Sequence, residues 1–181
     1  MNFNLLAFLP AFALFAIVSA GDASAGADTV NGHISTLVKS IHGLNTQLHQ
    51  PSVGTSYAAA LGVNTAALKL VSDLQSATKF LNNHGKLSDD DAHNALHNLQ
   101  VALPIVQDAT TTVADLKPKF AKLQIVDIAR SDVLELKTAT RAFMKSIVNA
   151  VPSAKVGNAK RKQAAYNAAL EKAASAYLLK H

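Results

Sequence analysis

No cysteine occurs among the 181 residues of this chain. Its absence excludes thiol nucleophiles, disulfide exchange and thiolate-bound metals as sources of function. Small exported domains usually depend on disulfides, so this chain must be stabilised by packing alone. Its length suits a single domain with a hydrophobic core of its own.

Sustained alternation of apolar and polar residues is also missing, and aromatic residues are few. Nothing after residue 28 therefore predicts a β-strand, and Ala, Leu, Lys and Gln dominate instead. From Val30 to Leu48 the apolar residues step by three and four, which is typical of a helix with one buried stripe. The pattern predicts an all-α fold, an antiparallel bundle of four to five amphipathic helices.

One long apolar run stands at the N-terminus, from Leu5 to Val18. Val18-Ser19-Ala20 then offers small residues at the positions that a signal peptidase recognises. We expect a signal peptide over residues 1–20 and a single secreted domain over 21–181, with Ala23-Ser24-Ala25 as a second small-residue cleavage site. A retained membrane anchor is the alternative, but the run is shorter than the ~20 residues of a spanning helix.

Turn and capping signals divide the remaining sequence into five helices, expected at about 30–48, 55–84, 88–116, 125–151 and 157–179. Asp28 is placed to cap the first helix, and Ser88 with Asp91 three residues later resembles a capping box. Pro104 is expected to kink the third helix without ending it, whereas Lys117-Pro118-Lys119 is expected to be irregular.

The cluster closest to a metal site is formed by Asp90, His93 and His97, which share one face of the third helix. Zinc usually requires a third strong ligand and, for hydrolysis, an adjacent Glu as base, and the sequence provides neither. An exposed capping turn followed by surface histidines explains the same residues. We therefore expect no metal and no cofactor.

Signals for catalysis and for nucleic-acid binding are missing as well. The sequence has no Gly-x-Ser-x-Gly turn and no Gly-rich phosphate loop, and the Asp89-Asp90-Asp91 run suits the dipole of a helix start. Residues 117–181 carry thirteen Lys or Arg against four Asp or Glu. This basic half has two interpretations, a site that binds a polyanion or a solvated face. Lys160-Arg161-Lys162 lacks interleaved aromatic residues, which argues against nucleic acid. The sequence thus indicates a protein that is not an enzyme.

The apolar stripes of the helices allow two interpretations. Such stripes usually form only a core. Alternatively, the bundle encloses an acyl-chain tunnel, or it opens and lays its apolar faces on a surface. The scarcity of core aromatic residues favours the second interpretation, as do Gly62 and Pro104, which interrupt otherwise regular helices.

Several features in a fixed order carry a resemblance to a known family. They are the heptads from Val30 to Leu48, the segment GKLSDDDA at 85–92, the step Leu103-Pro104-Ile105, the helix of Phe143 that ends at Val151-Pro152, and the closing AASAY at 173–177. In this order the sequence resembles the fungal hydrophobic surface-binding protein A family, which is related to cell-wall galactomannoproteins.

The resemblance implies a secreted, extracellular or loosely wall-associated bundle. Its implied partners are hydrophobic surfaces, fatty acids or other lipids held between the helices, and secreted hydrolases that it helps to reach hydrophobic substrates. A recruiting role through Lys160, Arg161 and Lys162, or a structural role in the cell wall, is the alternative. Because the family supplies no catalytic motif, the candidate lipid-binding residues are the inward apolar positions given by helical phase: Leu37, Ile41, Leu68, Val71, Leu99, Leu103, Leu136, Phe143 and Ile147.

Overall fold

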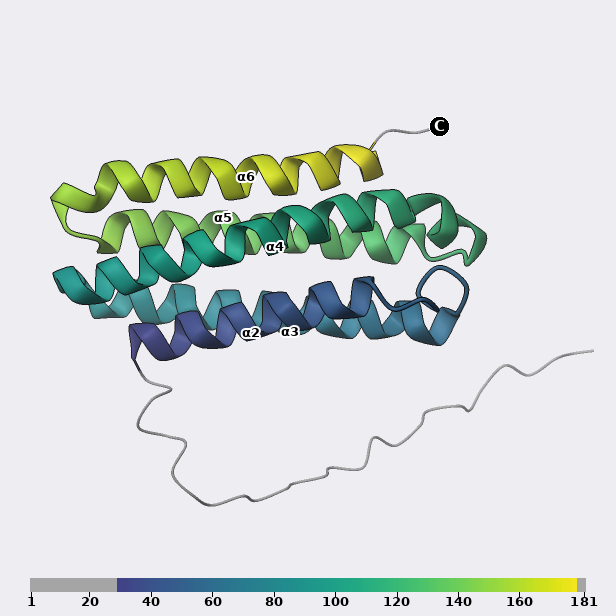
Figure 1. Cartoon of the computed structure of the whole chain (residues 1–181), viewed down its shortest axis with the longest axis horizontal. Coiled ribbons are helices and arrows are strands. Elements are labelled where there is room, and N and C mark those ends of the chain that lie inside the picture. The colour runs from purple at the N-terminus through teal and green to yellow at the C-terminus, as the bar shows by residue number, and fades with distance from the viewer. Residues whose placement is uncertain (1–28, 179–181) are drawn as a thin grey trace, which may run out of the picture.

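A computed structural model describes residues 29–178, which form five α-helices and one short 3-10 helix (Figure 1). The helices are α2 (Val30–Leu48), α3 (Tyr57–His84), α4 (Asp89–Lys122), α5 (Val126–Ala150), η1 (Ser153–Lys155) and α6 (Val156–Leu178). This part of the chain contains no strand, so the predicted all-α bundle is confirmed. The expected signal peptide lies outside the described residues.

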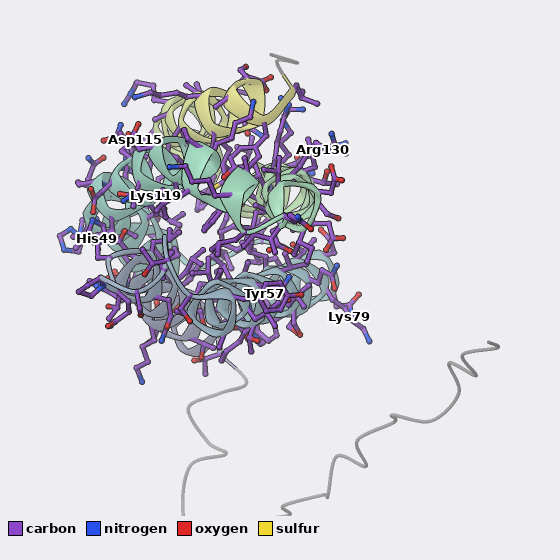
Figure 2. All side chains as sticks on the ribbon, turned by 90° about the vertical axis from the view of Figure 1, so that its right-hand side faces the viewer. His49, Tyr57, Lys79, Asp115, Lys119 and Arg130 are labelled. Carbon is purple, nitrogen blue, oxygen red and sulfur yellow. The ribbon has the colours of Figure 1, made fainter. Side chains whose placement is uncertain are left out.

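The helices form a closed ring rather than a stack of hairpins. Helix α2 packs against α3 and α4, helix α5 packs against α3 and α6, and α4 packs against α6. Viewed along the helix axes, the ring therefore runs in the order α2, α3, α5, α6, α4 (Figure 2). At ordinary interaxial distances, a ring of five places its centre about 1 Å further from each helix axis than a ring of four. Side chains must bridge that extra distance or leave a void.

The connection at residues 85–88 crosses one end of the ring, because α3 and α4 are not neighbours within it. Gly85 provides the turn with a φ of 83°. The backbone N–H of Leu87 donates to the Ala150 carbonyl at 2.8 Å, and Lys86 Nζ donates to the Asn149 carbonyl at 2.7 Å. These bonds satisfy carbonyls at the end of α5 and place a positive charge at its negative pole. Leu87 is buried, so the connection seals this end of the bundle.

Capping accounts for most of the helix starts. Ser88 Oγ accepts from the Asp91 backbone N–H at 3.1 Å, so the predicted start of α4 is confirmed. Ser56 caps α3 in the same way. At α2 the cap is Thr29, whose hydroxyl accepts from the Gly32 N–H at 3.0 Å. The expected cap, Asp28, is therefore corrected to Thr29, and Asp28 itself lies outside the described residues.

Helix α4 continues through both of its prolines to Lys122, so the irregular stretch predicted at Lys117-Pro118-Lys119 is wrong. Both prolines are exposed, and water can therefore hydrate the carbonyls that they release. Two buried tyrosines of α6 support the turns of α4 that precede its prolines. Tyr166 Oη donates to the Leu99 carbonyl before Pro104, and Tyr177 Oη donates to the Val113 carbonyl before Pro118, each at 2.8 Å. Packing by a neighbouring helix thus overrides a local breaker signal.

We predict that Leu87→Ala lowers the free energy of unfolding by ~2–4 kcal/mol, because it removes a buried side chain from the sealed end of the ring. Urea unfolding followed by circular dichroism measures the loss. The control is Leu68→Ala, since Leu68 is a 48% exposed leucine and should cost less than ~0.5 kcal/mol. Equal losses in the two variants would contradict a sealing role for Leu87.

Candidate functional site

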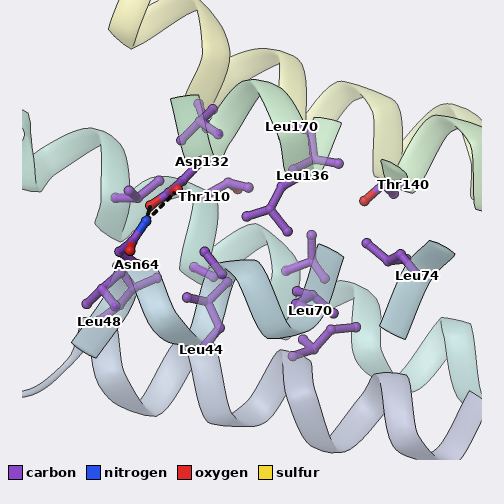
Figure 3. A pocket seen from close by; sticks show the side chains of 18 of the residues that line it. Leu44, Leu48, Asn64, Leu70, Leu74, Thr110, Asp132, Leu136, Thr140 and Leu170 are labelled. Carbon is purple, nitrogen blue, oxygen red and sulfur yellow. Dashed lines mark hydrogen bonds between the residues drawn. The ribbon is translucent and has the colours of Figure 1, made fainter. Parts of the chain in front are cut away.

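An apolar cavity follows the axis of the ring and is lined by all five helices (Figure 3). Along α2 it extends from Ile34 to Leu48, which is roughly 20 Å at the rise of an α-helix. The space between the lining atoms is about 1160 Å³ when its openings to solvent are counted, and about 100 Å³ of it can hold the centre of a water molecule. A long space in which so small a volume can hold the centre of a water molecule is a narrow channel. Such a channel suits a chain of methylenes better than a bulky ring.

Small side chains keep the channel open. Five alanines occupy positions on its wall where a larger apolar residue would reach the axis: Ala60, Ala67, Ala109, Ala129 and Ala173. They come from α3, α4, α5 and α6, so the deficit of volume is spread around the ring. The void is therefore built into four helices and does not arise from one missing side chain.

The channel is blind at one end and open near the other. Towards the 85–88 connection the channel wall ends, and Met144, Ile147 and Val151, which do not line the channel, are packed with no measurable exposure. Near the starts of α3 and α5, Leu61 and Ile128 line the channel and are each 36% exposed. The channel thus reaches the surface between α3 and α5, and these two leucine-sized side chains mark its opening.

A polar pair stands beside this opening. Asn64 Nδ2 on α3 donates to both carboxylate oxygens of Asp132 on α5, at 2.9 Å and 3.0 Å (Figure 3). Burial raises the pKa of Asp132 to about 6, the hydrogen bond from Asn64 opposes this rise, and Glu135 adds to it by repulsion. The channel wall includes no Lys, Arg or His within the described chain. The opening therefore carries an acid without a cationic partner in the wall.

The structure brings five of the nine predicted site residues onto the channel wall: Leu37, Ile41, Leu99, Leu136 and Phe143. Val71 and Ile147 are buried in the core outside the channel, and Leu103 is partly buried against the core. Leu68 is 48% exposed, so the prediction that it points inward is wrong. A lipid-binding role for the five wall residues stays a prediction.

The error at Leu68 has a simple cause. The large apolar residues of α3 alone predict a face that includes Leu68, whereas the buried face of the helix repeats through alanines as well as larger residues: Ala60, Val63, Ala67, Leu70, Leu74, Ala77 and Leu81. These positions are spaced three and four apart throughout, so a pattern that counts alanine as apolar identifies the correct face. Leu68 follows Ala67 by one residue and is rotated by about 100° from it.

The polar pair beside the opening is harder to predict from the sequence. Asn64 and Asp132 are polar and far apart in sequence, and only the packing of α3 on α5 brings them together.

In the expected recruiting cluster, Lys160 and Arg161 are exposed, whereas Lys162 is buried and donates to Gln100 Oε1 at 2.5 Å. Lys162 is therefore not part of a charged surface. His93 and His97 are exposed, and no three potential metal ligands gather within residues 29–178.

The fold and the channel define a class of protein: a helical ring that surrounds a narrow apolar space. The family model for hydrophobic surface binding protein A matches residues 27–149, and the chain belongs to this family. None of the curated proteins matches the chain. No helix between residues 29 and 178 combines the length and apolarity that crossing a membrane requires.

Solved structures share the fold at low sequence identity. AfMP4p in complex with palmitic acid is 19% identical with a TM-score of 0.77, covering 83% of this chain and 99% of its own. Ligand-binding domain 1 of the Penicillium marneffei MP1 protein, complexed with arachidonic acids, is 12% identical with a TM-score of 0.72 and covers 80% and 93%. Domain 2 of the same protein, complexed with multiple arachidonic acids, is 13% identical with a TM-score of 0.73 and covers 82% and 93%.

We predict that Asp132→Asn stabilises the protein at pH 7.5. A carboxyl whose pKa is raised on folding penalises the native state when it is ionised, so the penalty is complete above pH 6 and disappears below the unfolded value of 3.8. Because the carboxyl is only half-buried, we expect a gain of ~1 kcal/mol and not the full value of the shift.

Urea unfolding from pH 4 to pH 8 measures this gain, which should shrink steadily as the pH falls. Glu135→Gln is the matched control, since it removes the same charge from an exposed position one turn along α5. The free energy of unfolding should rise by less than about a third as much as in Asp132→Asn, because this change relieves only the repulsion between Glu135 and Asp132. A gain for Asp132→Asn that does not depend on pH would contradict the assignment.

Proposed function

We propose that this chain is a secreted, non-catalytic protein that holds the acyl chain of a lipid in its axial channel. The continuous apolar channel is the observation that carries the proposal, because a bundle evolved only for stability would fill its core. The family, named for hydrophobic surface binding, supports it, as do similar folds complexed with palmitic and arachidonic acids.

The energetics of such binding are favourable. Each methylene moved from water into the channel contributes ~0.8 kcal/mol, so ten carbons contribute ~8 kcal/mol before the cost of immobilising the ligand. Polar contacts at the opening add little to this sum. Their role is to fix the direction in which the lipid enters, and to decide which head groups are accepted.

The direct test is native mass spectrometry of protein purified from a fungal host, followed by removal of lipid and a thermal-shift titration with 16-carbon lipids. Ala67→Phe places a ring in the middle of the channel and should weaken binding by about tenfold or more. Ala109→Phe blocks the channel from α4 and should act in the same way.

Ala58→Phe is the matched control, because Ala58 is exposed on the same helix as Ala67. Its lipid binding should equal that of the unmodified chain. The proposal fails if the purified protein carries no lipid and its melting temperature does not respond to any 16-carbon lipid. It also fails if both blocked variants, folded by circular dichroism, bind as well as the control.

Adsorption to hydrophobic surfaces is a second candidate function, favoured by large apolar side chains exposed around the channel opening. Tyr57 and Leu68 on α3 are 53% and 48% exposed, close to the exposed Leu61 and Ile128. We call these four residues the portal face. Exposed apolar residues gathered beside an opening suit contact with an apolar surface, from which a lipid can enter directly.

The prediction for this candidate is that Tyr57→Ser combined with Leu68→Ser reduces adsorption to hydrophobic beads by about threefold or more, because neither residue lines the channel. Depletion from solution is measured at low and high salt. Adsorption should persist at high salt, since it is apolar. Val101→Ser is the control, because Val101 is 54% exposed on α4, and an equal loss there would argue against a localised face.

A further inference from the structure

We propose that the Asn64–Asp132 pair is the head-group site of the channel, and that it selects lipids with an uncharged, hydrogen-bond-donating head group over ionised fatty acids. Fatty alcohols and monoacylglycerols are lipids of this chemistry. The inference rests on the proposed function, because it requires that an acyl chain occupies the channel.

The position of the pair suits a head group. Asn64 and Asp132 line the channel near its opening and are half-buried, with the exposed Leu61 and Ile128 close by on the same two helices. The opposite end of the channel is closed by packed core residues. A lipid that enters tail first therefore leaves its polar end beside the pair, with access to water.

The hydrogen-bonding capacity of the pair favours donors. An ionised carboxylate has about four acceptor positions and no donor. Asn64 donates to both oxygens of Asp132 and leaves the remaining acceptor positions available to a ligand. A hydroxyl group can donate to them, whereas the carboxylate of a fatty acid cannot.

The charge around the pair disfavours an anion. No described Lys, Arg or His lies on the channel wall, and no ion pair within residues 29–178 includes Asp132. Its titratable neighbours are Glu135 on the same helix and Tyr177 on α6, and α3 contributes the neutral Asn64. The pKa of Asp132, about 6, leaves its carboxyl ionised at pH 7.5. An incoming carboxylate would therefore meet a like charge at a half-buried site.

Other polar groups of the wall are less suited to this role. The Tyr166 hydroxyl donates to the Leu99 carbonyl and the Thr110 hydroxyl to the Gln107 carbonyl, so the protons of both are already used. Thr140 lies on the far side of Leu136 from the pair (Figure 3). A head group at Thr140 would stand deep in the channel, where desolvation is costly.

Equilibrium binding at pH 7.5 tests the inference with two 16-carbon ligands, hexadecan-1-ol and palmitate, each kept below its aggregation limit. The unmodified protein should bind hexadecan-1-ol about tenfold or more tightly than palmitate, because of the like charges. In Asp132→Asn the ratio should fall to about threefold or less, because a neutral amide can also donate to a carboxylate. Glu135→Gln removes the same charge outside the channel and should keep the original ratio.

Each other outcome overturns the inference. If the unmodified protein binds palmitate as tightly as hexadecan-1-ol, or if Asp132→Asn leaves the ratio unchanged while folded by circular dichroism, the pair does not select the head group. If Glu135→Gln shifts the ratio as much as Asp132→Asn, the selection is a general effect of charge. If neither ligand binds the unmodified protein, the proposed function itself fails, and the inference fails with it.

Discussion

The geometric constraint on which this structure depends is the closure of five helices into a single ring. In a smaller bundle, leucine-sized side chains from facing helices meet at the axis and fill it. Here the axis is further from every helix, and several of the inward positions are alanine. The channel follows from these two facts together, since larger residues at Ala67 or Ala109 would close it even within the same ring.

The connection between α3 and α4 helps to close one end of the channel. Because α3 and α4 are not neighbours, the connection between them must cross the bundle, and it crosses over the end of α5. Leu87 fills the space below this crossing, and Lys86 binds the last carbonyls of α5. At the other end Val53 and Phe120 are also fully buried, but Leu61 and Ile128 remain partly open to water. The connection between α4 and α5, which are not neighbours in the ring either, crosses this second end, so the direction of the channel depends on the partly exposed Leu61 and Ile128.

Much of this fold could be predicted from the sequence because helix boundaries depend on local signals. The start of α4 at Ser88 and the end of α5 before Pro152 follow from capping and from proline chemistry, which act over a few residues. Pro118 shows the limit of such signals, since support from Tyr177 on a neighbouring helix lies outside any local window. The order of helices in the ring is likewise a tertiary property. It decides which faces of α3 and α5 meet.

The same tertiary property governs the Asn64–Asp132 pair, and its energetics bear on why it is there. A cavity of about 100 Å³ costs ~2 kcal/mol of stability, and the half-buried carboxyl adds a further cost whenever it is ionised. Neither feature adds to the stability of this domain, which has no disulfides and depends on packing. A bound lipid offsets both, because its methylenes fill the void and its head group can donate to the carboxylate. Asp132 lines the same channel that contains the void, so one ligand can relieve both costs. An acyl chain without a hydrogen-bond donor at its head relieves only the cost of the void.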